Sequence, residues 1–255
     1  VLAVGESAED DDAPALPTGL DDPAVSVPGI CLTQLAGIRA LAAQGLDPRE
    51  VPPVAVLGHS QGHLATQALA GVPEAELLAV ARLIGVAAQL VGRRRGLLGE
   101  VMVSVSDVDP ARVDRVLADL GHDHRVVSHL RNGRRAVVLS GPADDLRTVV
   151  TRLEQVAADE RAARERKETG GAPFAPVIEP LPTTLAFHHP DLATTADLVA
   201  TWAEACNLDA DRARSLTLAS IVDPVDWVAD LESAADAGAG WVLDLGPGDL
   251  ATRLS

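Results

Sequence analysis

Val54-Ala55-Val56-Leu57-Gly58-His59-Ser60-Gln61-Gly62 is the stretch of this sequence that decides the fold. An apolar run stands directly before a Gly-x-Ser-x-Gly turn, and a helix-like segment, 62–69, follows it. The pattern predicts a buried strand over 53–57, a sharp turn carrying Ser60, and a helix to about Ala70. Glycines beside the serine suit such a strained turn. The helix N-terminus there can stabilise an oxyanion. A glycine-rich turn with a buried, hydrogen-bonded serine is the structural alternative.

Helices and strands are expected on both sides of this turn. The apolar spacing over 30–44 favours a helix that Gly45 ends, and a long helix is expected over 74–91. The next expected elements run strand, helix, strand, strand, helix, strand, over 101–106, 110–120, 125–130, 135–140, 143–168 and 181–187. The remainder predicts a helix over 191–205, a strand over 217–221, a helix over 225–237 and a strand over 241–245.

These elements predict an α/β fold in two parts. Residues 1–96 and 184–255 are expected to form an α/β-hydrolase-like core. Residues 97–183, with the order βαββαβ, are expected to form an inserted ferredoxin-like subdomain. A ligand site is expected in the cleft between the two parts.

Composition excludes several classes of function. The 255 residues carry a net charge of −16, which argues against nucleic-acid binding. No apolar run reaches the roughly 18–20 residues that span a bilayer, so no membrane association is expected. The acidic N-terminus is unlike a secretory signal, and two widely spaced cysteines indicate neither a disulfide framework nor a metal site. A cytoplasmic protein is expected. An acidic partner would need a local basic patch, for which 93–95 and Arg131, Arg134 and Arg135 are candidates.

A serine nucleophile needs a base that accepts its proton. His188 and His189 follow the last expected strand of the insert, at an edge that faces the expected cleft. His59 lies inside the turn, and its side chain is expected to point away from the serine. His63 follows Ser60 by one helical turn, where it fits a pocket-lining position or a competing base. Three more histidines of the insert are expected to face solvent: His122, His124 and His129.

Together these motifs resemble the acyl-CoA:acyl-carrier-protein transacylase family. Gly58-His59-Ser60-Gln61-Gly62 is similar to that family's Gly-His-Ser-x-Gly, and Phe187-His188-His189-Pro190 to its Phe-His-Ser-Pro. Further similar segments are Pro28–Gln34, Asn132–Gly141 and Leu245–Gly248. On 222–227 and 241–250, the sequence most resembles the acetyl-loading acyltransferase domain of actinobacterial type I fatty acid synthases.

The resemblance implies a role for each matching residue. Ser60 would be the acylated nucleophile, His188 its base, and the Gln61 N–H one oxyanion donor. A backbone carbonyl near the Gly-Pro-Gly would orient the histidine, so no catalytic carboxylate is expected. The substrate would be acetyl-CoA and the acceptor the phosphopantetheine arm of an acyl carrier protein domain, with no bound cofactor or metal. The other partners would be further domains of a fatty acid synthase.

Two features depart from the family pattern. The Gly-Gln-Gly segment that supplies a second oxyanion donor is absent from this sequence. Malonyl-specific members carry an arginine on the long helix after the serine, where this chain has Gly85 or a small apolar neighbour. A pocket without that cation favours an uncharged acetyl group, because burying an unpaired carboxylate is costly. Arg82 lies about one turn earlier on the same helix. The candidate pocket residues are therefore His59, His63, Arg82 and Gly85.

Other functions stay open at this point. The chain could transfer malonyl or palmitoyl groups. A serine esterase or thioesterase would require a catalytic Asp or Glu between the nucleophile and the histidine, and would turn over without an acceptor. A catalytically incomplete structural domain of a synthase would leave Ser60 unacylated.

Overall fold

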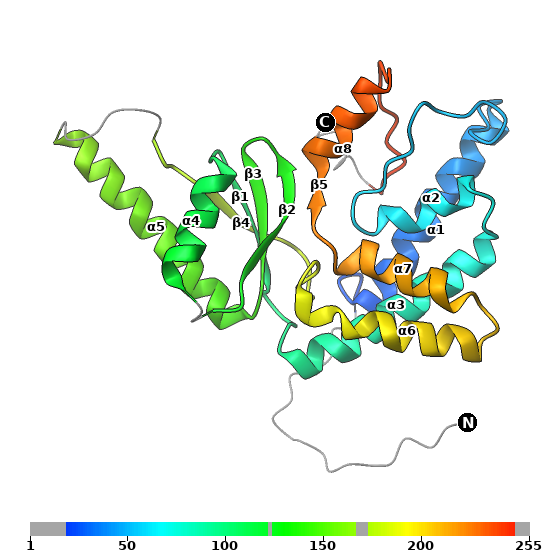
Figure 1. The fold of residues 1–255 in the computed structure, drawn as a ribbon, viewed down its shortest axis with the longest axis horizontal. Helices are drawn as coiled ribbons and strands as arrows, with labels where there is room; N and C mark the ends of the chain where they lie inside the picture. The colour runs from blue at the N-terminus through cyan, green and yellow to red at the C-terminus, as the bar shows by residue number, and fades with distance from the viewer. Residues whose placement is uncertain (1–18, 122–123, 167–172, 248–255) are drawn as a thin grey trace, which may run out of the picture.

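The computed structural model describes residues 19–121, 124–166 and 173–247. The helices are α1 Pro23–Ala43, α2 Gly62–Leu69, α3 Glu74–Arg95, α4 Pro110–Leu120, α5 Ala143–Glu165, α6 Thr194–Ala205, α7 Ala210–Ile221 and α8 Trp227–Asp236, with a 3-10 helix, η1, at Pro190–Leu192. The strands are β1 Met102–Ser106, β2 Val127–Gly133, β3 Ala136–Ser140, β4 Val177–Pro180 and β5 Val225–Asp226. Figure 1 shows α1, α2, α3, α6 and α7 gathered on one side and the sheet with α4 and α5 on the other.

One sheet carries the five strands of the described residues, in the order β4-β1-β3-β2-β5. The first four strands pair antiparallel, and β5 pairs parallel to β2. Alternate residues face opposite sides, as a pleated sheet requires. Val103 and Val105 pack into a cluster with α4 and α5, whereas Met102, Leu130 and Val138 pack into the core of the helical part. The sheet is therefore buried on both faces, and it joins the two parts of the fold.

Within 101–180 the elements occur in the predicted order, but the last strand lies earlier than expected. β4 covers 177–180 rather than 181–187. Backbone bonds from Thr183 N–H to Leu181 O and from Phe187 N–H to Leu185 O fold the chain tightly there. Leu185 keeps a single bridge to Leu98. Because its backbone makes these local turns, the segment cannot form a regular ladder.

The sheet predicted for an α/β-hydrolase-like core is absent from the described residues. Segments 53–57 and 241–245 are not strands, and their apolar side chains are exposed, Val54 by 61% and Trp241 by 78%. A strand is held by its neighbours, and no described segment pairs with these two. Residues 217–221, predicted as a strand, lie in α7. Asp209 caps that helix by accepting a hydrogen bond from the Arg212 N–H, and Ala213, Leu216 and Ile221 pack into the core of the helical part.

Helix α1 begins seven residues before its predicted start at Ile30, and its first turns are held by α3. Asp22 caps it by accepting from the Ala24 N–H, with Pro23 at the first position. Pro28 has no N–H to donate to the Ala24 carbonyl four residues earlier. The Arg82 guanidinium of α3 donates to that carbonyl instead.

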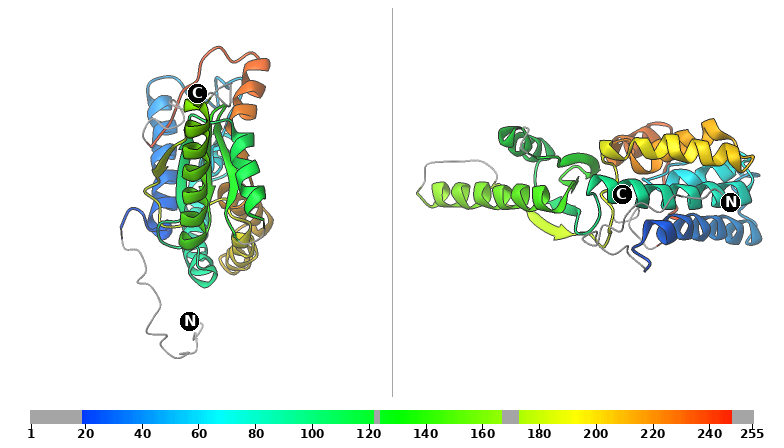
Figure 2. Two further views of the ribbon diagram at one scale, coloured as in Figure 1. Left: turned by 90° about the vertical axis from the view of Figure 1, so that its left-hand side faces the viewer. Right: turned by 90° about the horizontal axis from the view of Figure 1, so that it is seen from below.

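Helices α1 and α3 satisfy the length and composition of membrane spans. In this fold, Figure 2 shows α3 lying between α1 and α6 as the middle of three helical layers. Four residues of α1, Val27, Cys31, Leu35 and Ile38, share one hydrophobic cluster with the buried aliphatic residues of α3. Their apolar character is thus used in packing the helical part.

Candidate active site

The turn before α2 holds Ser60 in a left-handed backbone conformation, with φ of 52°. A Cβ added at Gly58 would lie 2.6 Å from the His63 backbone nitrogen, so this close approach requires glycine. At Gly62 an added Cβ would meet only an ordinary van der Waals contact. Of the two glycines beside the serine, Gly58 is therefore required by steric contact and Gly62 is not. The turn places the Ser60 side chain beside the chain segment that follows β4.

His188 lies in that segment and is fully buried. Its Nε2 is 2.7 Å from Ser60 Oγ, and its Nδ1 is 2.6 Å from the Asp223 carbonyl oxygen. Because a carbonyl only accepts, Nδ1 carries the proton, and the lone pair of Nε2 faces the serine hydroxyl. The same hydroxyl lies 3.2 Å from the Ser220 carbonyl. Serine, imidazole and carbonyl thus form a chain in which the histidine is ready to accept a proton.

Burial lowers the pKa of His188 to about 4, although its hydrogen bond to the Asp223 carbonyl opposes this shift. Positive charge on the neighbouring histidines His59, His129 and His63 would lower this pKa further. At neutral pH the imidazole is therefore uncharged, which is the form that acts as a base.

The group that orients His188 differs from the one that the resemblance implied. Asp223, directly before Pro224 and β5, supplies the carbonyl. The Gly246 carbonyl accepts from Gln34 Nε2 at 2.8 Å instead. Among the described side chains, no carboxylate bonds to the His188 ring. The resulting arrangement is a serine–histidine pair oriented by backbone.

His189, the adjacent histidine, has both ring nitrogens engaged. Its Nε2 donates to the Arg125 carbonyl at 2.6 Å, and its Nδ1 accepts from the Asp191 N–H at 3.1 Å. The ring is buried, and burial lowers its pKa. These bonds anchor the segment to the residues before β2, and they leave His188 as the histidine that faces the serine.

Gln61 stands at the N-terminus of α2, directly after the serine. Among the described residues its backbone N–H meets no acceptor, and its side-chain Oε1 is buried without a hydrogen-bond partner. Free N–H groups at the first turn of a helix favour a negative charge. The position therefore suits an oxyanion donor next to Ser60.

His59 and His63 border the pair from the side of α8. His59 Nε2 donates to Asn132 Oδ1 at 2.9 Å, and its ring meets Trp227 edge to face at 5.4 Å. Burial lowers the pKa of both histidines, and the Asp230 carboxylate opposes that shift. His59 thus contacts β2 and α8, whereas His63 is the less enclosed of the two.

Arg82 and Gly85 lie where α3 packs against the start of α1. The Arg82 guanidinium bonds the Ala24 carbonyl, and a Cβ at Gly85 would come within 2.3 Å of the Pro23 carbonyl oxygen. Neither contact involves Ser60 or His188. The structure accounts for both residues through helix packing.

We therefore expect Gly85→Ala to destabilise the fold by roughly 2–3 kcal/mol, because backbone atoms must move apart. Arg82→Ala should cost about 1 kcal/mol, the value of one hydrogen bond. Urea unfolding measures both. Gly29→Ala on α1 is the matched control, since nothing lies within 4 Å of its added Cβ. An unchanged stability together with an altered acetyl-to-malonyl preference would instead place these residues at the acyl group.

Sequence reasoning missed the part that β2 plays at this site. His129, expected to face solvent, is partly buried, and its Nδ1 donates to the His188 carbonyl at 3.0 Å. Asn132, three residues further along β2, accepts a hydrogen bond from His59. Strand alternation could place 129 and 131 on one face, but the sequence does not show that the His188 backbone lies beside His129.

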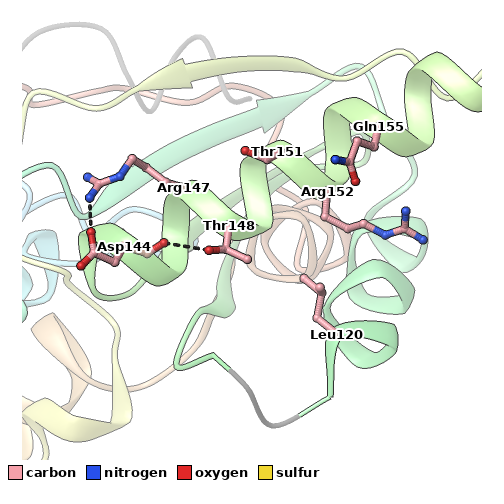
Figure 3. A pocket seen from close by; sticks show the side chains of 7 residues that line it. All are labelled: Leu120, Asp144, Arg147, Thr148, Thr151, Arg152 and Gln155. Carbon is pink, nitrogen blue, oxygen red and sulfur yellow. Dashed lines mark hydrogen bonds and ion pairs between the residues drawn. The ribbon is translucent and has the colours of Figure 1, made fainter.

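A cavity of about 540 Å³ lies elsewhere, between the end of α4 and α5 (Figure 3). Its polar lining includes Arg147, Thr148 and Arg152. Arg147 pairs with Asp144, and the Thr148 hydroxyl donates to the Asp144 carbonyl. The lining contains neither Ser60 nor His188, so we assign it no catalytic role.

Comparison with known proteins gives matches of two kinds. Residues 101–180 match the family model of the fatty acid synthase central AT domain. No curated protein matches the sequence. The acyltransferase domain of the iterative polyketide synthase in enediyne biosynthesis is 25% identical with a TM-score of 0.64. That match covers 95% of this chain, which spans only 60% of the other.

Two further solved structures share the fold at lower identity. The malonyl CoA-acyl carrier protein transacylase from Coxiella burnetii is 19% identical with a TM-score of 0.69, over 92% of this chain and 72% of that one. A malonyl-transacylase in complex with a type II polyketide synthase acyl-carrier protein is 20% identical with a TM-score of 0.70, over 92% and 74%. The described residues thus form a mixed α/β fold that matches acyltransferase domain structures.

Proposed function

We propose that this chain is an acyl-CoA:acyl-carrier-protein S-acyltransferase with Ser60 as nucleophile and His188 as general base. The observation that carries the proposal is the 2.7 Å contact between Ser60 Oγ and His188 Nε2, with Nδ1 bonded to a carbonyl. This geometry suits transfer of a proton from serine to imidazole. The match of 101–180 to a synthase acyltransferase domain and the acyltransferase-like fold support acyl transfer as the reaction.

The reaction proceeds in two halves. His188 Nε2 takes the Ser60 proton while Oγ attacks the thioester carbonyl, and the oxyanion lies near the Gln61 N–H. The carbon–sulfur bond breaks, and the CoA thiolate leaves with the proton from His188. The phosphopantetheine thiol of a carrier protein then gives its proton to His188 and attacks the acyl-serine. Collapse of this second intermediate releases Ser60, which recovers the proton.

We further propose that the acyl group is acetyl. Among the described contacts, no arginine or lysine bonds Ser60, Gln61 or His188, and Arg82 is committed to the Ala24 carbonyl. A free malonyl carboxylate would then be buried without a partner, at a cost of several kcal/mol. An uncharged acetyl group carries no such cost.

Competition between acetyl-CoA and malonyl-CoA for transfer to a holo acyl carrier protein tests this preference. We expect acetyl transfer to exceed malonyl transfer by at least about tenfold in kcat/KM, equivalent to 1.4 kcal/mol. Preferred malonyl transfer would contradict the acetyl assignment. Rapid release of free acetate without a carrier would favour the thioesterase alternative, and an unacylated Ser60 would favour a structural domain.

We also propose that 97–183 is a ferredoxin-like subdomain inserted between core residues 1–96 and 184–255. The order β1-α4-β2-β3-α5-β4 and the antiparallel arrangement β4-β1-β3-β2 support this division. A separate hydrophobic cluster under α4 and α5 supports it as well. The carrier protein and the other synthase domains remain proposed partners.

A further inference from the structure

Strand β2 contacts the two backbone elements that hold the base. His129, in the middle of β2, donates from Nδ1 to the His188 carbonyl at 3.0 Å. The next two residues of the strand pair with β5, Leu130 with Val225 and Arg131 with Asp226. Asp223, whose carbonyl accepts a hydrogen bond from the His188 ring, lies just before β5 in the chain. One strand therefore fixes both the peptide that carries the imidazole and the segment that orients it.

The backbone of His188 needs such support. Its φ of 57° lies in the left-handed region, which costs a non-glycine residue about 1 kcal/mol or more. The His188 N–H donates to the Ile221 carbonyl at 2.7 Å, at the end of α7. The His188 carbonyl accepts from His129. The backbone of His188 is thus held at its N–H by the end of α7 and at its carbonyl by the His129 side chain of β2.

We propose that His129 is a positioning residue for His188, acting through the hydrogen bond from its Nδ1–H to the His188 carbonyl. It keeps the imidazole between the Asp223 carbonyl and the Ser60 hydroxyl, and it does not itself touch the substrate. The inference deepens the proposed function, because it rests on His188 being the base. A displacement of about 1 Å of a catalytic group can cost roughly 100-fold in rate.

Two substitutions separate the hydrogen bond from simple packing. His129→Leu keeps a side chain of similar volume but replaces the polar ring with an apolar group and so removes the donor. His129→Asn places an amide N–H near the position of Nδ1–H. We expect His129→Leu to lower kcat by roughly 10–100-fold with KM changed less than about threefold, and His129→Asn to retain kcat within about threefold.

His124 provides the matched control, since it is a partly buried histidine of the same region with both ring nitrogens engaged. Its Nε2 contacts the Leu117 carbonyl, and its Nδ1 accepts from the Val126 N–H. Its partners lie outside the Ser60–His188 pair, so His124→Asn should leave kcat unchanged. If His129→Leu does not fold, His129→Asp replaces it, because an ionised carboxylate has the size of Asn and cannot donate to a carbonyl.

The rate at which a fluorophosphonate labels Ser60 gives a readout that needs neither acyl-CoA nor carrier protein. In that reaction Oγ displaces fluoride from phosphorus, and His188 takes the serine proton. We expect the labelling rates to rank wild type, His129→Asn, then His129→Leu. Equal loss in the Asn and Leu variants, or full rates in Leu, would overturn the positioning role. If the labelling rates rank as expected but no acyl-CoA acylates Ser60, the proposed acyl transfer is wrong and the positioning role of His129 still holds.

Discussion

His188→Ala is expected to lower the rate of Ser60 acylation by roughly 10³–10⁴-fold, because it removes the base that accepts the serine proton. Rapid-quench measurement of the acyl-enzyme gives this rate directly. Since the pKa of His188 lies at about 4, the wild-type rate should stay level from pH 7 to about 5 and fall below that.

His63→Ala is the control for this experiment. His63 is close enough to His188 for its charge to lower the His188 pKa, but among the described residues Ser60 Oγ bonds His188 and the Ser220 carbonyl rather than His63. We expect its loss to change the acylation rate less than about tenfold. A larger loss in His63→Ala than in His188→Ala would make His63 the base, and would contradict the assignment.

The fold should lose stability as the pH falls. His188 titrates near pH 4 when folded and near 6.5 when unfolded, so the unfolded chain binds its proton first. Its contribution is therefore complete above pH 6.5 and is lost as the pH falls toward 4. The shift corresponds to about 3 kcal/mol in all, of which about 2 kcal/mol is lost by pH 5. Burial also lowers the pKa of His59, His63 and His189, which acts in the same direction.

Urea unfolding at pH 7.5 and pH 5 measures this loss before most carboxylates titrate. His188→Gln is the control, because it removes the titrating ring and should reduce the difference between the two pH values. A free energy of unfolding that is equal at both values, or greater at pH 5, would show that the buried histidines do not govern acid stability.

Local sequence signals predicted the turn at Ser60 and the elements between 101 and 165. The close approach at Gly58 and the α2 helix each depend on residues that lie close together in the chain. The hairpin between β2 and β3 also formed, but its turn lies at 134–135, and Asn132 and Gly133 belong to β2. The α/β class followed from the same signals. The resemblance of 187–190 to the family motif implied that His188 rather than His189 is the base. The geometry gives the physical reason, since both ring nitrogens of His189 are bonded elsewhere.

Features that depend on distant segments could not be predicted in this way. Segment 53–57 has the composition of a strand, but pairing requires a neighbour that composition does not reveal. His129 bonds the His188 carbonyl although 59 positions separate the two residues in the chain. Arg82 was a pocket candidate because it lies one helical turn before Gly85. Its guanidinium instead bonds the Ala24 carbonyl of α1, which Pro28 cannot satisfy.

The most direct test of the account is the intact mass of the protein after mixing with acetyl-CoA, followed by peptide mapping. We expect one acetyl group, on the peptide that contains Ser60, and none in Ser60→Ala. Acetylation that persists in Ser60→Ala, or a wild-type protein that stays unmodified, would contradict the claim that Ser60 is the nucleophile of an acyl transfer.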